Sequence, residues 1–212
     1  MNHETFRKLT QNYPFFKSNI FTHIVDNVRI LRRQVSEWLK KGYILQLKRG
    51  MYTLRNEDRA VGFSNYFLAN NLYSPSYVSL ETALSYYGMI PERVYAITSI
   101  SSKKTQHFEN SFGYFTYNQL KPELYGNFVT VKDEFGNNFF IATPERAIID
   151  FFYFKTKGLR KINKDIFEES FRLQNLDLLN KRKLLAITKE FKQKKLITLV
   201  NLLLKQIEEE KR

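Results

Sequence analysis

Residues 28–54 read VRILRRQVSEWLKKGYILQLKRGMYTL, and the spacing of their apolar residues changes at Gly42. Before this glycine, apolar residues recur every three or four positions, which predicts a helix from about Val28 to Lys41 with one buried stripe. Glycine is the usual residue just past a helix end. After it the period becomes two, which predicts two short strands joined by a tight turn at Lys48-Arg49-Gly50.

The segments around this stretch complete a winged helix-turn-helix pattern. A first helix is predicted at residues 2–11 and a second at 19–25, ahead of the helix at 28–41 and the strands at 43–47 and 51–54. Three helices followed by a hairpin is the order of a winged helix. In that arrangement the last helix enters the major groove of DNA, which is wide enough for a helix. The hairpin tip then lies along neighbouring phosphates.

Cations dominate the side of the third helix opposite its apolar stripe, and the hairpin turn adds two more. A cationic helix face is often only a solvated face, but here it coincides with the order of elements and with a basic turn. Glu37 lies on the same side, where it could accept from a cytosine amino group, but we expect it to pair with Lys41 one turn later. The residues predicted to contact DNA are Arg29, Arg32, Arg33, Ser36, Lys40, Lys48 and Arg49.

The net charge of +13 is concentrated at the two ends of the chain. Residues 1–58 and 159–212 each carry a net charge of +6, whereas residues 59–158 carry +1. An excess of this size favours a polyanionic partner, either nucleic acid or an anionic membrane surface, although an AT-rich genome also enriches Lys. The same ranges are the predicted domains of an α+β protein: a winged helix, a mixed domain with an antiparallel sheet, and a helical C-terminal extension.

The middle range is predicted to alternate helices and strands. Helices are expected at 63–71, 80–87 and 144–154, and strands at 94–100, 114–117, 128–131 and 139–142. Ser79 is expected to cap the second of these helices, and Thr143 and Pro144 to begin the third. The acids Glu81, Glu145 and Asp150 are expected in solvated or helix-terminal positions, and Tyr86 and Tyr87 in the core or a surface cleft.

The C-terminal range is predicted to form helices at about 181–192 and 195–209. Its basic surface is interpreted as a solvated face, with an added phosphate contact or a partner-binding surface as alternatives. The residues of this surface are Lys181, Arg182, Lys183, Lys189, Lys192, Lys194 and Lys195.

Several chemistries are excluded by composition and motif. Cysteine is absent, so disulfides, thiolate metal sites and cysteine nucleophiles do not occur. The three His are far apart without metal-ligand spacing, and no P-loop, GxGxxG or GxSxG motif is present. We therefore expect no enzyme, metal or cofactor. A start without a signal-like pattern and the lack of about 18 consecutive apolar residues predict a cytoplasmic protein that does not cross a membrane.

Four short strings of residues in this sequence resemble strings found in one known protein family. They are KRGMY at 48–52, YVSLETALSYYGMIPE at 77–92, YAITS at 95–99 and ATPERAIID at 142–150. Together they resemble the AbiEi family of type IV toxin–antitoxin (abortive infection) antitoxins and transcriptional regulators. The resemblance covers about residues 10–155. Many members of the family carry Lys where Arg146 stands.

The resemblance implies a cytoplasmic bacterial repressor that binds double-stranded DNA at promoter repeats of its own phage-defence operon. It also implies a functional partner, a nucleotidyltransferase-like toxin, which such an antitoxin neutralises without needing direct contact. An alternative of a different class is a protein-interaction module whose winged helix is only architectural. A nucleic-acid-processing enzyme built around Glu190-Phe191-Lys192 is a remote alternative, because no partner acid precedes that triplet on a strand.

Overall fold

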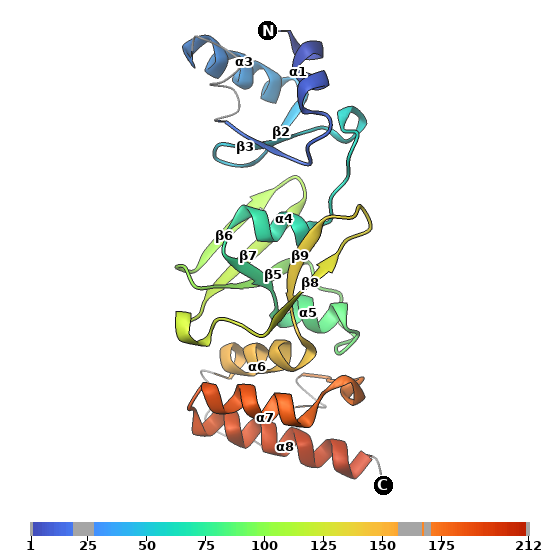
Figure 1. Ribbon diagram of the computed structural model, residues 1–212, viewed down its shortest axis with the longest axis vertical. Coiled ribbons are helices and arrows are strands. Elements are labelled where there is room, and N and C mark those ends of the chain that lie inside the picture. The colour runs from blue at the N-terminus through green and yellow to red at the C-terminus, as the bar shows by residue number, and fades with distance from the viewer. Residues whose placement is uncertain (1, 19–27, 157–166, 168–170, 211–212) are drawn as a thin grey trace.

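The computed structural model describes residues 2–18, 28–156, 167 and 171–210 of the 212-residue chain. Figure 1 shows an elongated molecule with α1 and α3 at one end, a sheet in the middle, and α7 and α8 at the other end. The second helix predicted at residues 19–25 lies outside the described residues.

The N-terminal unit, residues 2–18 and 28–54, contains two helices and a small antiparallel sheet. Its elements are α1 (His3–Thr10), β1 (Phe16–Lys17), α3 (Val28–Lys40), β2 (Ile44–Lys48) and β3 (Met51–Leu54). β3 lies between β1 and β2. The predicted first helix, third helix and hairpin are confirmed. β1 was not predicted, because two residues are too few to show an alternating pattern.

A mixed sheet forms the central part. The elements there are η1 (Asn56–Asp58), α4 (Asn65–Leu72), β4 (Ser76–Val78), α5 (Leu80–Tyr86), β5 (Ala96–Ser101), β6 (Gln106–Asn110), β7 (Gly113–Gln119), η2 (Pro122–Leu124), β8 (Phe128–Lys132), β9 (Asn138–Ala142) and α6 (Pro144–Lys155). The strand order is β6-β7-β5-β4-β9-β8. The helices and the four predicted strands of this range are confirmed, with shifts at their ends.

The expectation of an antiparallel sheet is wrong for two strand pairs. β5 pairs with β7 in parallel, and β4 pairs with β9 in parallel. The reason is that β4 and β6 were not predicted as strands. β4 has only three residues directly after Pro75, too short to show a pattern, yet it lies between β5 and β9 and separates them.

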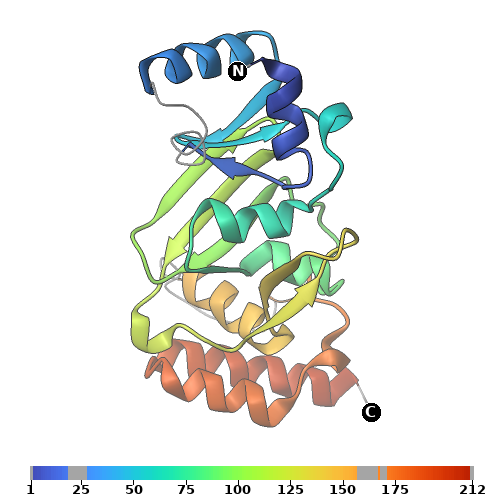
Figure 2. The same cartoon turned by 45° about the horizontal axis from the view of Figure 1, so that its top comes forward.

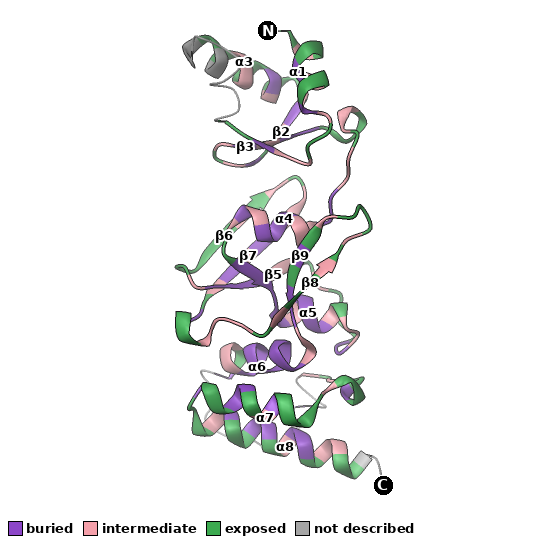
Figure 3. Cartoon of the chain, in the orientation of Figure 1, coloured by how far each residue is buried: buried purple, intermediate pink, exposed green. Residues whose placement is uncertain are grey.

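The C-terminal part contains η4 (Leu176–Leu178), α7 (Lys181–Glu190) and α8 (Lys194–Glu210), so both predicted tail helices are confirmed. Figures 1 and 2 show α6 between the sheet and the pair α7–α8. One large apolar core runs from Leu47 and Met51 of the hairpin through the sheet to Leu199 and Leu203 of α8. Figure 3 shows buried residues on the side of α7 and α8 that faces α6 and exposed residues on the outer side.

Candidate nucleic-acid interface

α3 is anchored on one side by the core of the N-terminal unit. Trp38 is 6% exposed, and its ring stacks on that of Phe6 with centroids 4.7 Å apart. Val35 and Leu39 are half-buried against the same cluster, which also contains Ile44. These residues belong to the apolar stripe that the sequence predicts, so the other side of α3 faces outward.

The outward side of α3 presents three of the predicted DNA contacts. Arg33, Ser36 and Lys40 are all exposed, and the Arg33 side chain retains 85% of its accessibility. The side chains of Arg29 and Arg32 lie outside the described part of the structure. A long, exposed guanidinium on a rigid helix has the geometry that a bidentate contact to a base edge or phosphate needs.

Glu37 does not pair as predicted. Its carboxylate lies 3.2 Å from Arg33 Nε, one turn earlier, instead of contacting Lys41. The Lys41 ammonium lies 6.0 Å from the centroid of the Tyr43 ring. An exposed pair such as Arg33–Glu37 contributes only about 0–1 kcal/mol, so Arg33 can leave Glu37 for a stronger anion at little cost.

The tip of the hairpin is exposed, but its flanks are not. Arg49 is exposed in the turn, and Gly50 beside it has a positive φ of 77°, a conformation that favours glycine. Leu47 and Met51 on either side are 1% exposed and belong to the central core. The hairpin therefore joins the N-terminal unit to the central part and leaves Arg49 available to solvent.

Lys48 is placed at this joint, away from the open tip. Its ammonium donates to the carbonyl of Leu72, the last residue of α4, and so satisfies an acceptor that a helix end leaves without a partner. Burial lowers the pKa of Lys48, and the charges of Lys17 and Lys103 lower it further. Lys48 thus has a structural role that the sequence did not indicate.

These interactions reveal a group of cations that the sequence analysis missed. We call Lys17, Lys48 and Lys103 the junction cluster, because they come from β1, β2 and the loop after β5 and meet where the N-terminal unit contacts the central part. Lys103 donates to the Ser74 carbonyl, and the Lys17 and Lys103 side chains are exposed. The charges of Lys17 and Lys103 disfavour the charged form of Lys48, and a polyanion would relieve that repulsion.

The basic surface predicted on the tail is largely present. Lys181 pairs with Glu208 at 2.5 Å, and Lys195 is half-buried and donates to the Thr156 carbonyl. The remaining members are exposed: Arg182, Lys183, Lys189, Lys192 and Lys194. They lie at the end of the molecule opposite α3, so the two basic ends do not form one continuous face (Figure 1).

The acids expected to be solvated are partly buried, and this expectation is wrong for Asp150. Asp150 is completely buried, with Arg146 Nε 2.9 Å away and the hydroxyls of Tyr77 and Ser79 donating to it. The Ser79 hydroxyl therefore does not cap α5 as predicted, because Asp150 recruits it. Burial raises the pKa of the Asp150 carboxyl, with the Arg146 charge opposing.

The other predicted acids and tyrosines also serve packing. Glu145 is 4% exposed in the first turn of α6 and accepts from the backbone N–H of Asn180, which ties α6 to the tail. Tyr87 is half-buried, and its hydroxyl donates to the Ala142 carbonyl, whereas Tyr86 is 41% exposed. The two acids of α6 are held by different neighbours: Glu145 by the tail at Asn180, and Asp150 by Tyr77 and Ser79 of the central part.

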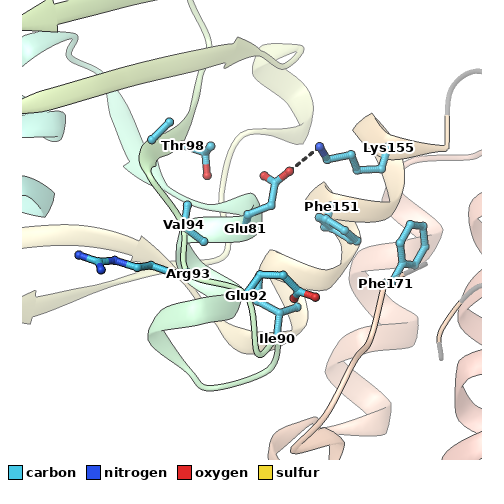
Figure 4. Close-up of a pocket in the computed structure, with 10 residues that line it drawn as sticks. Glu81, Ile90, Glu92, Arg93, Val94, Thr98, Phe151, Lys155 and Phe171 are labelled. Atoms are coloured by element: carbon cyan, nitrogen blue, oxygen red, sulfur yellow. Dashed lines mark ion pairs between the residues drawn. The ribbon is translucent and has the colours of Figure 1, made fainter. Parts of the chain in front are cut away.

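A pocket of about 450 Å³ lies beside α5, β5 and α6 (Figure 4). Its floor includes Ile90, Val94 and Phe151. Glu81 at its edge pairs with Lys155 at 2.5 Å, and Glu92 pairs with Arg172 at 3.1 Å. These two pairs neutralise their own charges, and Arg93 adds a further cation to the lining.

No family model matches the chain, and none of the curated proteins matches it significantly. Among the helices that the structure describes, none is both long and apolar enough to cross a bilayer.

Proposed function

We propose that this protein is a DNA-binding transcriptional regulator in which α3 enters the major groove and the β2–β3 hairpin acts as the wing. The exposed side of α3 is the observation that carries this proposal. It presents Arg33, Ser36 and Lys40 on a helix held from behind by Trp38. A helix fixed by packing on one side and cationic on the other suits insertion into a groove lined by phosphates.

The junction cluster supports the same proposal through electrostatics. Lys17 and Lys103 remain exposed, and Arg49 is exposed at the hairpin tip. These cations would contact phosphates beside the groove that α3 occupies, while α3 reads base edges. Lys48 would act indirectly, by holding the hairpin against α4.

We propose further that the regulator represses its own operon and acts as the antitoxin of a type IV system in a bacterial cytoplasm. This part of the proposal rests on the resemblance to the AbiEi family. The strings that carry the resemblance lie far apart in the sequence, yet Tyr77 and Ser79 of one meet Arg146 and Asp150 of another in the buried network. Contacts between these strings are expected if the strings form part of a structural framework that this chain shares with the family.

The test is binding of the purified chain to its own upstream DNA and to a scrambled duplex of equal length. We expect tighter binding to the upstream DNA, and repression of a reporter placed behind it. Co-expression with the product of a neighbouring nucleotidyltransferase-like gene tests the antitoxin role, since growth should be restored only when the regulator is present. Equal, weak binding to both duplexes would refute the proposal that the regulator recognises a specific DNA sequence.

A second candidate is a protein-interaction module, and one observation favours it. Leu47 and Met51 of the hairpin are buried in the central core, so the hairpin has an architectural role whether or not DNA binds. This candidate predicts that Arg33→Ala leaves DNA affinity unchanged.

A further inference from the structure

β8 is the last strand on one side of the central sheet, and among the described residues no strand lies beyond it (Figure 1). Val129 is 41% exposed, and Thr130 and Lys132 are exposed as well. β8 keeps one register with β9 from Phe128 to Lys132, without the bulge or the proline that would hinder a further strand. An open edge of this kind can accept another strand.

The backbone groups of β8 that bond to β9 can be identified from the two ends of the pair. The Asn127 carbonyl accepts from the N–H of Thr143, and Asp133 donates its N–H to the Asn137 carbonyl. Hydrogen-bonded residues alternate along an antiparallel pair, and the register between these two ends is unbroken. Every second residue from 127 to 133 therefore bonds to β9, and the residues between them do not.

The residues between them are Phe128, Thr130 and Lys132, whose backbone N–H and C=O groups point out of the sheet. These groups make no hydrogen bond within the described part of the chain. They recur every two residues along the strand, so donors and acceptors lie in one row. Such a row can pair with a copy of itself, because each residue of an antiparallel hydrogen-bonded pair both donates and accepts.

The opposite edge of the central sheet differs from that of β8. There β6 contacts β2 of the N-terminal unit, and Asn110 Nδ2 donates to the Leu47 carbonyl. The exposed residues of β6 include His107 and Glu109, which are polar. Coverage and polar side chains both protect a sheet edge from pairing. In the described part of the central sheet, the open edge with exposed β-branched residues is therefore that of β8.

We propose that β8 pairs antiparallel with β8 of a second copy of this chain, about a two-fold axis beside Thr130. Thr130 then faces Thr130 of the second copy, and Phe128 faces Lys132. In this register all of the outward N–H and C=O groups find partners, and the two copies contribute the same surface. A shift by two residues would leave one outward residue of each copy beyond the end of the other strand.

The side chains of β8 fit this register on both faces. Val129 lies opposite Val131 of the second copy, at a non-hydrogen-bonded position where side chains come closest. On the other face the Lys132 side chain lies against the Phe128 ring, which favours a cation–π contact. Lys132 is the one charged residue of β8 and meets no like charge. Because residues 59–158 carry a net charge of only +1, two copies meet there with little repulsion.

The expected dimer is weak, because two strands of five residues form an interface smaller than the standard size. Phe140 lies opposite Thr130 on β9 and is 43% exposed, so it adds apolar surface beside the axis. If α3 binds DNA as proposed above, the dimer presents two copies of α3 to a symmetric DNA site. The pairing itself does not depend on DNA, since β8 belongs to the central part of the molecule.

The test is sedimentation equilibrium of the full chain, without DNA, over a series of protein concentrations. We expect a monomer–dimer equilibrium. Thr130→Pro should weaken dimerisation about tenfold or more, because it removes the two N–H donors nearest the axis. The Thr130 N–H makes no bond to β9, so an edge strand tolerates proline at this position.

A change of charge at the axis tests the register. Thr130→Lys and Thr130→Glu each place two like charges face to face, so each alone should dimerise several-fold more weakly at low salt. A mixture of the two variants should restore dimerisation, because every Lys then faces a Glu. Thr198→Lys and Thr198→Glu, at an exposed position of α8, are the matched controls and should dimerise as the unmodified chain does.

Each outcome bears on the proposal. Restored dimerisation in the mixture supports the two-fold register and shows that both variants are folded. A chain that stays monomeric at every concentration would overturn the proposal, and so would a dimer that the Thr130 variants leave intact or that the mixture does not restore. Arg33→Ala should dimerise as the unmodified chain does, so failure of the promoter-binding proposal is recognised separately.

Discussion

Two helices of this protein carry the same local pair, an arginine followed four residues later by an acid, in opposite surroundings. On α3, Arg33 lies 3.2 Å from Glu37, and their side chains are 85% and 51% exposed. On α6, Arg146 lies 2.9 Å from Asp150, and both are completely buried. The helix repeat gives the two pairs the same spacing, so the difference comes from what covers each helix.

This difference in exposure leaves Arg33 able to bind a partner, whereas Arg146 stabilises the fold. Water already solvates Arg33, so it can exchange Glu37 for a phosphate or base at little cost. Arg146 lies among the rings of Tyr77 and Phe191, with the tail over it, and releasing it would leave a buried carboxylate without its counter-ion.

The largest expected effect is at the buried pair. Arg146→Ala should lower the free energy of unfolding by about 3–5 kcal/mol, because Asp150 would be left in the core without its counter-ion. Arg146→Lys should cost less, since it keeps a cation beside Asp150. Urea denaturation of the unmodified chain, of these two variants and of Glu37→Ala checks this. A loss for Arg146→Ala no larger than that for Glu37→Ala would remove the contrast between the two pairs.

The exposed pair should behave in the opposite way. Arg33→Ala should change the free energy of unfolding by at most about 0.5 kcal/mol. It should nevertheless weaken binding to promoter DNA by about 1–3 kcal/mol, because a bidentate base contact is lost. Trp38→Ala is the control for unfolding, at an expected cost of about 3–5 kcal/mol. Binding titrations alongside melting curves measure both quantities, and unchanged promoter affinity in a folded Arg33→Ala protein would contradict the proposal.

A smaller effect is expected at the hairpin tip. Arg49→Ala should weaken binding to all duplexes alike and flatten the log–log salt dependence by about one unit, as the loss of one phosphate contact does. Lys183→Ala, an exposed cation on α7, is the matched control and should leave DNA binding unchanged. An equal loss in both variants would mean that the tail shares the interface.

The smallest effect concerns pH and the N-terminal unit. Burial lowers the pKa of His3 below its usual 6.5, with Asp58 opposing and Arg55 and Arg7 reinforcing the shift. The unfolded chain therefore binds this proton first as pH falls, so the N-terminal unit should lose stability from about pH 6.5 downward through the lowered pKa.

The matched variant for this test is His3→Phe. It keeps an aromatic ring against Tyr43, where the present centroids are 4.1 Å apart, but does not titrate. Its melting temperature should fall less between pH 7.5 and 5.5 than that of the unmodified chain. An equal fall in both would show that His3 is not the group responsible.

Part of this structure can be predicted from the sequence. Elements that neighbouring residues determine can be predicted, whereas contacts between residues far apart in the chain cannot. α3 and the hairpin follow from the change of period at Gly42, which neighbouring residues determine. The Ser79 hydroxyl shows the limit, because a cap was predicted from position, whereas Asp150, 71 residues away, binds it instead.

The candidate sites show the same limit. Arg33, Ser36 and Lys40 could be predicted from a helical wheel. Lys17 and Lys103 could not, since they meet Lys48 only after the N-terminal unit packs on the central part. The parallel pairing of β4 with β9 could not be predicted from the sequence either, because a strand of three residues is too short to show an alternating pattern.

The central claim is that the cationic side of α3 and the adjacent cations bind promoter DNA. Its most direct test is a titration of the unmodified chain against its upstream DNA over a series of salt concentrations. If about six phosphates are contacted, the slope of log affinity against log salt should be about −5, with the upstream DNA preferred over a scrambled duplex at every concentration. An affinity that does not change between low and physiological salt would contradict the claim.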